Sequence, residues 1–236
     1  MAIATLPRND VPQITASQMQ QAVMLATGKF GLDSRVLVEH TGRNLYEMAQ
    51  AYAPTGPVLV VAGRGDNGSG GLAAARLLGV RGRKVWVVPT HEEGNYSGIP
   101  REQLETLKHL PNVRVKTSLP KMKFSLVIDS AIGTSLEGPP RGRNLDVITV
   151  INAMDESTTV ISVDVPTGVE SDTGDVPGEA VNATMTLAVA LPKVGLEPGG
   201  HVGRIFVGDL GFPPGVYEEL GLSPLTLPDF VTELEG

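Results

Sequence analysis

The chain has 236 residues, of which 41% are hydrophobic and 19% charged, and its formal net charge at pH 7 is −7. This length suits one α/β domain with a sizeable core, and the acidic balance disfavours a nucleic-acid surface. Because the chain contains no cysteine, disulfides, thiolate metal sites and cysteine nucleophiles are excluded.

The two ends of the chain show little sign of regular structure. Residues 1–13 contain two prolines and weak periodicity, so we expect a loose arm, and a proline-bearing tail is expected over 223–236. The start has no apolar signal segment, and no stretch approaches ~18 consecutive apolar residues. The sequence therefore predicts a single domain over 1–236 in a cytoplasmic protein that does not enter a membrane.

Two predicted helices precede an alternation of strands and helices. Thr15 is the expected N-cap of a first helix, which Gly28 and Gly31 end, and a second helix is expected over 34–53. Apolar runs predict strands over 58–61, 85–88, 113–116, 126–129, 159–165, 185–190 and 204–207. Further helices are expected from residue 72 and over 101–110, 145–154 and 214–220. Such alternation predicts βαβ units and an α/β fold with a mainly parallel sheet.

The segment Val58–Gly71, VLVVAGRGDNGSGG, joins an apolar strand to a glycine-rich stretch, and the helix-forming sequence LAAARLL follows. Bare backbone N–H groups at a helix N-terminus form an anion site. The alternative is a tight turn that needs glycines for positive φ angles. Five glycines within nine residues exceed what one turn requires, so we predict a ligand-binding loop over 63–71.

Two aspartates end apolar strands, at Asp129 and Asp164, and each is followed by a hydroxyl residue and a glycine. Ligands of open α/β sheets bind outside the carboxyl ends of the strands, where these loops would meet. A carboxylate there is costly unless it is used or neutralised. Each aspartate alone is equally well explained as a helix cap or turn residue, but the repeated pattern favours a functional site.

Other catalytic signals are weak. Gly63, Gly65 and Gly68 spell the dinucleotide fingerprint, but the acidic residue expected ~20 positions later is missing, so a hydride-transferring dehydrogenase fits poorly. The four histidines have no metal-ligand spacing, and no Walker lysine or nucleophile elbow occurs. Lys193 is expected to be a surface lysine in a loop.

Six motifs in order resemble one known family, the YjeF N-terminal domain, which comprises the NAD(P)H-hydrate epimerases. They are TASQMQ (15–20), LVEHTGRN (37–44), VAGRGDNGSGG (61–71), IDSAIGTSLEGPPRG (128–142), VDVPTGVESDTG (163–174) and PKVGLEPGGHVGRIFVGDLGFP (192–213). The resemblance covers about residues 14–222. It implies a three-layer α/β/α sandwich with a Rossmann-like sheet, often dimeric.

The resemblance also implies an activity, the epimerisation of the R and S forms of NADHX and NADPHX, the hydrated and damaged nicotinamide cofactors. A separate dehydratase that acts on the product is the implied partner. The implied cofactor is a potassium ion, with Asn67, Asp129 and Thr167 matching its ligands. Substrate-binding positions are matched by Asp66, Asn67, Gly68, Ser69, Gly70, Gly133, Thr134, Ser135, Leu136, Glu137, Gly138, Pro139 and Asp164. We assign the proton transfer to Asp164.

The glycine segment departs from the family, whose loop usually reads GPGNNGGDG. Asp66 stands at an asparagine position, Ser69 at a glycine position and Gly70 at an aspartate position. In the second loop, Ser135 stands where the family has a glycine. A non-catalytic nucleotide-binding or dimerisation module of the same fold is therefore the alternative to the epimerase. The cation-binding residues favour the enzyme, whereas Gly70 favours the module.

Overall fold

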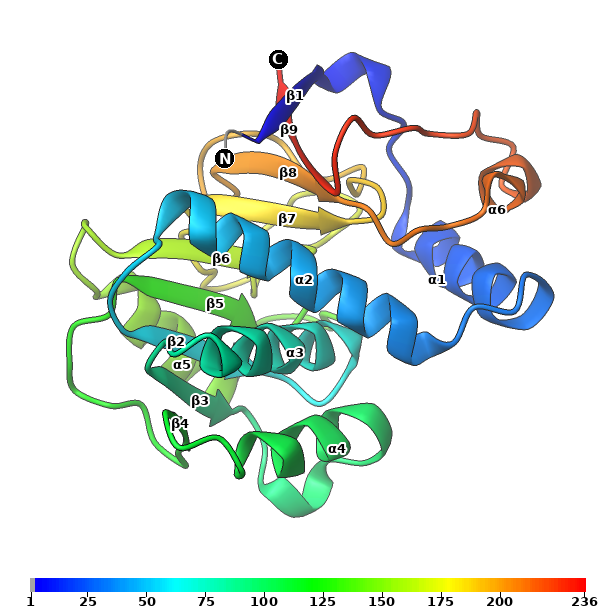
Figure 1. Cartoon of the computed structure of the whole chain (residues 1–236). Coiled ribbons are helices and arrows are strands. Elements are labelled where there is room, and N and C mark those ends of the chain that lie inside the picture. Colours follow the sequence, from blue (N-terminus) through cyan, green and yellow to red (C-terminus); the bar gives the residue numbers. More distant parts are fainter. Residues whose placement is uncertain (1–2) are drawn as a thin grey trace.

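The structure, a computed structural model, describes residues 3–236, in which nine strands form one sheet (Figure 1). The strands lie in the order β1-β9-β8-β7-β6-β5-β2-β3-β4. Their bounds are β1 Ala4–Pro7, β2 Val58–Ala62, β3 Val85–Pro89, β4 Val113–Val115, β5 Leu126–Ser130, β6 Thr159–Val163, β7 Met185–Val189, β8 Arg204–Gly208 and β9 Val231–Glu235. Neighbours are parallel except β8 and β9, which confirms the expected mainly parallel sheet.

The helices agree closely with those expected from the sequence. They are α1 Ala16–Met24, α2 Ser34–Tyr52, α3 Asp66–Val80, α4 Gly98–Leu107, α5 Arg143–Asn152 and α6 Pro214–Glu219. Shorter helical turns are η1 Arg8–Asp10, η2 Leu25–Lys29 and η3 Glu93–Asn95. The cap of α1 is confirmed, because the Thr15 hydroxyl accepts from the backbone N–H of Gln18 while the Gln18 side chain accepts from that of Thr15.

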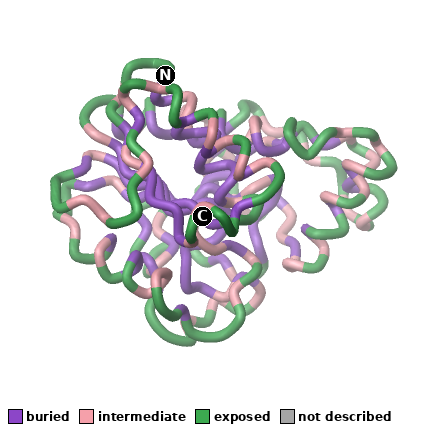
Figure 2. Tube along the Cα trace, turned by 90° about the horizontal axis from the view of Figure 1, so that it is seen from below, coloured by how far each residue is buried: buried purple, intermediate pink, exposed green. Residues whose placement is uncertain are grey.

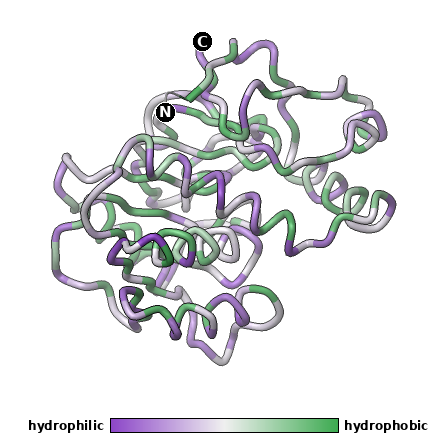
Figure 3. The backbone as a smooth tube through the Cα atoms, in the orientation of Figure 1, coloured by the Kyte–Doolittle hydropathy of each residue, from purple (hydrophilic) through white to green (hydrophobic). Residues whose placement is uncertain are grey.

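Helices cover both faces of the sheet, as a three-layer sandwich requires (Figure 1). On one face, α2, α3 and α4 pack Leu45, Leu72 and Leu104 against the strands. On the other face, α5 packs Val147 and Ile148 against β2 and β5. All five residues of β2 are buried, as expected for a strand covered on both faces. Figures 2 and 3 show this core as buried, mostly hydrophobic chain at the centre of the molecule.

The prediction of a loose arm over 1–13 is wrong for Ala4–Pro7, which form β1, and the expected proline-bearing tail contains a strand, β9; residues 1 and 2 of the arm lie outside the described residues. Strand β1 pairs in parallel with β9, and β9 pairs antiparallel with β8, so that the two ends complete one edge of the sheet. Leu234 of β9 is buried against the core that includes Ile205 and Val207. The two end segments thus form strands because they pair with each other, and the sequence of either segment alone does not show this pairing.

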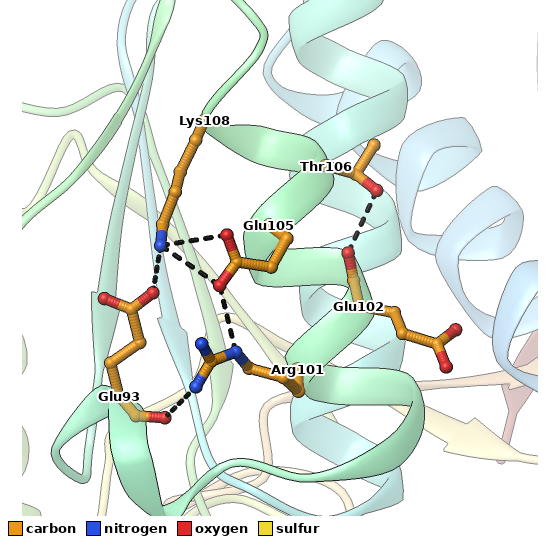
Figure 4. Close-up of polar contacts among 6 residues, drawn as sticks. All are labelled: Glu93, Arg101, Glu102, Glu105, Thr106 and Lys108. Atoms are coloured by element: carbon orange, nitrogen blue, oxygen red, sulfur yellow. Dashed lines mark hydrogen bonds and ion pairs between the residues drawn. The ribbon is translucent and has the colours of Figure 1, made fainter.

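The outer surface is strongly charged along α4. Lys108 contacts the carboxylates of Glu93 and Glu105, and Arg101 Nε lies 2.9 Å from a Glu105 oxygen (Figure 4). These side chains are largely exposed, so the ion pairs add little stability. Among the described residues, 3–236, none of the helices combines the length and the apolar character that crossing a bilayer requires.

Candidate functional site

A cavity of about 420 Å³ opens at the carboxyl ends of the central strands. One wall comes from α1 and α2 and is mainly apolar, with Met19, Val23, Leu37 and Val38 among its residues. The other lining residues include four polar ones from three connections: Asp66 and Asn67 in the first turn of α3, and Thr134 and Asp164 in loops. Because these connections follow β2, β5 and β6, the position agrees with the rule for open parallel sheets.

The glycine segment builds its part of this lining by close packing. Helix α3 begins at Asp66, so most of the expected loop is helical. A Cβ atom at Gly68 would lie 1.9 Å from the carbonyl oxygen of Gly63, and one at Gly71 would lie 2.0 Å from the Ser130 hydroxyl. None of the five glycines is among the described residues with positive φ. The glycines therefore allow α3 to pack closely against Ser130 of β5 and against Gly63 in the preceding loop. The alternative explanation, a tight turn that needs glycines for positive φ angles, is wrong.

The open end of α3 keeps the features of an anion site. Gly65 is the N-cap, a Cβ there would meet nothing within 4 Å, and no side chain caps the helix. Asp66 places a carboxylate in the first turn, where the helix dipole stabilises negative charge.

Asp129 is the last residue but one of β5, lies outside the cavity lining and has 1% of its surface exposed. Its oxygens accept hydrogen bonds from the Ser162 hydroxyl at 2.8 Å, the Thr167 backbone N–H at 2.9 Å and the Thr167 hydroxyl at 2.7 Å. Burial raises the pKa of the Asp129 carboxyl, although these hydrogen bonds oppose the shift. Within residues 3–236 no lysine, arginine or histidine forms an ion pair with this carboxylate.

Asn67 lies on the opposite side of the backbone at 132–133. Its amide nitrogen donates to the Val163 carbonyl at 2.9 Å, and a Cβ at Gly133 would lie 1.9 Å from that nitrogen. The adjacent Ile132 N–H donates to the Thr167 hydroxyl at 3.0 Å. The three residues expected to bind potassium are thus arranged around one short segment, and they offer oxygen donors beside a buried carboxylate that lacks a cationic partner. That donor chemistry fits a hard cation.

Asp164 follows β6 in the left-handed region, with φ of +67°. Its carboxylate is buried, and Oδ1 accepts from the Val189 N–H at 3.1 Å and from Lys193 Nζ at 2.5 Å. Lys193 is 0% exposed, so its expected place on the surface is wrong. Sequence reasoning missed this lysine because its acidic partner, Asp164, lies 29 residues away in the chain, and the signal available was its position between Pro192 and Gly195.

The remaining predicted substrate-binding residues lie outside the cavity lining. Gly68, Ser69 and Gly70 are buried within α3, and the Ser69 hydroxyl donates to the Gly65 carbonyl at 3.0 Å. Of the loop 133–139, Thr134 lines the cavity and Gly133 packs on Asn67, whereas Ser135, Glu137, Gly138 and Pro139 are exposed. Contact between the substrate and these residues remains a prediction.

Known proteins resemble this chain over most of its length. An NAD(P)H-hydrate epimerase of Truepera radiovictrix is 53% identical over 215 residues, which are 91% of this chain and 97% of the relative. One of Dehalogenimonas lykanthroporepellens is 36% identical, with 92% and 89% covered. A bifunctional NAD(P)H-hydrate repair enzyme Nnr of Moorella thermoacetica is 32% identical, and the match covers 85% of this chain but 40% of that enzyme.

The fold has a relative of known structure. The crystal structure of the yeast protein YNL200c superposes with a TM-score of 0.82 at 19% identity, covering 95% of this chain and 100% of that one. The model of the family described as YjeF-related protein N-terminus matches residues 34–195, which is more than half of the chain. The chain therefore belongs to the family of YjeF-related protein N-termini.

Proposed function

We propose that this protein epimerises the R and S forms of hydrated NADH and NADPH and so takes part in repair of the nicotinamide cofactors. The observation that carries the proposal is Asp164, a buried carboxylate that lines the cavity while its hydrogen bonds to described residues all involve Oδ1. Two relatives with high coverage are named NAD(P)H-hydrate epimerase, which supports the same reaction here.

Inverting the hydrated carbon requires a bond to that carbon to break and form again. Either the hydroxyl leaves and returns on the other face, or the ring opens at that carbon and closes again. Ring opening needs one group that accepts the proton of the hydroxyl and later returns it, whereas loss of the hydroxyl as water needs a group that first donates a proton and later takes it back. Asp164 fills the first of these roles, since its Oδ2 is available to the cavity and its carboxylate stabilises positive charge that develops on the ring.

The apolar and the polar lining of the cavity suit the two parts of such a substrate. We place the nicotinamide ring beside Asp164, with its flat apolar face toward Leu37 and Val38. The polar side, at Asp66 and Thr134, then faces ribose hydroxyls and amide groups. A cavity of about 420 Å³ lies within the usual range for small-molecule sites.

We further propose that Asn67, Asp129 and Thr167 hold a potassium ion. When bound, the ion supplies positive charge beside the buried Asp129 carboxylate and thereby favours its ionised form. Asp129 itself anchors the loop after β6, because it accepts both the backbone N–H and the hydroxyl of Thr167. The loop that carries Asp164 is thus fixed both at Thr167, by Asp129, and at Asp164, by Lys193.

A coupled assay tests the function. Purified protein is mixed with R-NADHX, potassium and a dehydratase specific for the S form, and NADH is followed at 340 nm. We expect recovery faster than the spontaneous epimerisation, with the rate strongly lowered but still measurable in Asp164→Asn and the potassium dependence weakened in Asp129→Asn. If the folded protein gives no acceleration, it is a nucleotide-binding or dimerisation module. Light scattering of the same sample measures whether it is the dimer that we expect.

A further inference from the structure

We infer that Lys193 is a positioning residue for the reaction: it fixes and charge-balances Asp164 so that the oxygen Oδ2 of that carboxylate remains for the substrate. The inference rests on the proposed function. It starts from the burial of Lys193, whose side chain has 0% exposure and is among the largest of the fully buried side chains in the described part of the chain. A lysine in such a place requires partners for its charge and for three N–H groups.

All three donors of the ammonium group are used. Nζ lies 2.5 Å from Asp164 Oδ1, 3.0 Å from the Leu191 carbonyl oxygen and 3.3 Å from the Val189 carbonyl oxygen. An ammonium group has no further hydrogen to offer. Lys193 therefore acts on the substrate through Asp164.

The geometry separates the two oxygens of Asp164. Oδ1 accepts from Lys193 and from the Val189 N–H, whereas no hydrogen bond from a described residue, 3–236, reaches Oδ2. Asp164 lines the cavity and Lys193 does not. One oxygen is thus committed to the protein, and the other is the proton-accepting atom.

The backbone around Lys193 is fixed as firmly as its side chain. Ile14 pairs with this segment: its N–H donates to the Pro192 carbonyl and its carbonyl accepts from the Val194 N–H, both at 3.0 Å. Gly195 allows close approach, because a Cβ there would lie 2.4 Å from the Gly174 nitrogen. Since α1 begins two residues after Ile14, the same pairing joins Lys193 to the apolar wall of the cavity.

The charge of Lys193 matters as much as its position. A buried carboxylate without a cation would be strongly disfavoured in its ionised form. Lys193 supplies the compensating charge from the protein side, so that the ionised carboxylate persists while Oδ2 remains open to the substrate. Removing the lysine should therefore impair the chemical step more than substrate binding, because the cavity lining itself is unchanged.

The test compares Lys193→Met with Leu196→Ala, which removes a buried side chain from the same loop but leaves the ion pair intact. In the coupled assay we expect Lys193→Met to lower kcat by ~100-fold, with KM changed much less. Leu196→Ala should lower the unfolding temperature while kcat stays close to that of the original chain. Lys193→Gln, which keeps a hydrogen-bond donor but no charge, serves as a second variant if the methionine variant does not fold.

A double variant separates action through Asp164 from independent action. If Lys193 works through Asp164, Asp164→Asn with Lys193→Met should be no slower than Asp164→Asn alone. The inference is overturned if a folded Lys193 variant keeps the original kcat, if Leu196→Ala loses kcat equally, or if the two losses multiply. An inactive original chain would instead contradict the proposed function, so the two failures are distinguishable.

Discussion

At the scale of single residues, Thr41 occupies the space that a side chain at position 70 would need. A Cβ at Gly70 would lie 2.5 Å from Thr41 Cγ2, so the aspartate that the family usually has at this position does not fit beside Thr41. Asp66 lies four residues earlier, which is about one helical turn, and its side chain lines the cavity. Asp66 therefore supplies a carboxylate to the cavity wall, although the family's aspartate is absent at position 70.

This packing makes Gly70→Ala destabilising. Overpacking costs about 1–3 kcal/mol, which exceeds the gain of up to ~1 kcal/mol from the better helix propensity of alanine. Chemical unfolding should show the loss, and Thr41→Ser in the same chain should restore part of it, because the serine lacks Cγ2. Gly28→Ala, in the helical turn η2, is the control, since nothing lies within 4 Å of a Cβ there. Equal effects of the two glycine variants would contradict this explanation.

His91, two residues after the end of β3, gives a prediction for pH dependence. Burial lowers the pKa of His91 below 6.5, and the positive charges of Arg64 and Arg143 lower it further. The unfolded chain then binds the proton more readily, so His91 contributes stability above pH 6.5 that is lost as pH falls through the native pKa.

Arg143→Ala should therefore raise the pKa of His91, although not fully to 6.5, because burial is the largest cause of the shift. A proton NMR titration of the imidazole measures this, with His91→Gln to assign the signal. Arg141→Ala, which removes a neighbouring charge that does not act on His91, is the control. An unchanged titration in Arg143→Ala would show that the charge of Arg143 does not lower the pKa of His91.

At the scale of elements, the two chain ends form a mixed edge of the sheet. Strand β9 lies between β1 and β8, so each end depends on the other for its backbone hydrogen bonds. Leu234 is 5% exposed and packs with residues of β8.

Leu234→Ala should lower the free energy of unfolding by about 2–5 kcal/mol, as for other buried leucines. Denaturant titration provides the measurement. Thr226→Ala, at an exposed position between α6 and β9, should have little effect. A loose tail, by contrast, would make Leu234→Ala as mild as the control.

The elements that the sequence predicted well are those with strong local signals. The capping box of Thr15 and the apolar run of β2 are decided within a few residues. Because glycine is a poor helix former, the sequence predicts the start of α3 at residue 72, whereas the helix begins at Asp66. Only the close contacts with Gly63 and Ser130 explain why glycines occur in this helix. The end strands escaped prediction because their order arises from mutual pairing.

At the scale of the whole molecule, parallel topology brings the polar loops together. Strands β5 and β6 are parallel neighbours, and the contact between Asp129 and Thr167 joins the end of β5 to the loop after β6. The expected parallel sheet predicts that these two segments meet. The apolar wall from α1 and α2 was not predicted, because the docking of helices that precede a sheet has no local sequence signal. Lys193 was missed for the same reason, since its ion pair joins residues 29 apart in the chain.

The most direct test of the central claim is to incubate the protein separately with pure R-NADHX and pure S-NADHX and to follow both epimers by chromatography. A catalyst changes rates and leaves the equilibrium unchanged. We therefore predict that both samples reach the same ratio of epimers, faster than without protein, and that Asp164→Asn removes most of this acceleration. If neither pure epimer is converted faster than in buffer while the protein is folded and potassium is present, the account is contradicted.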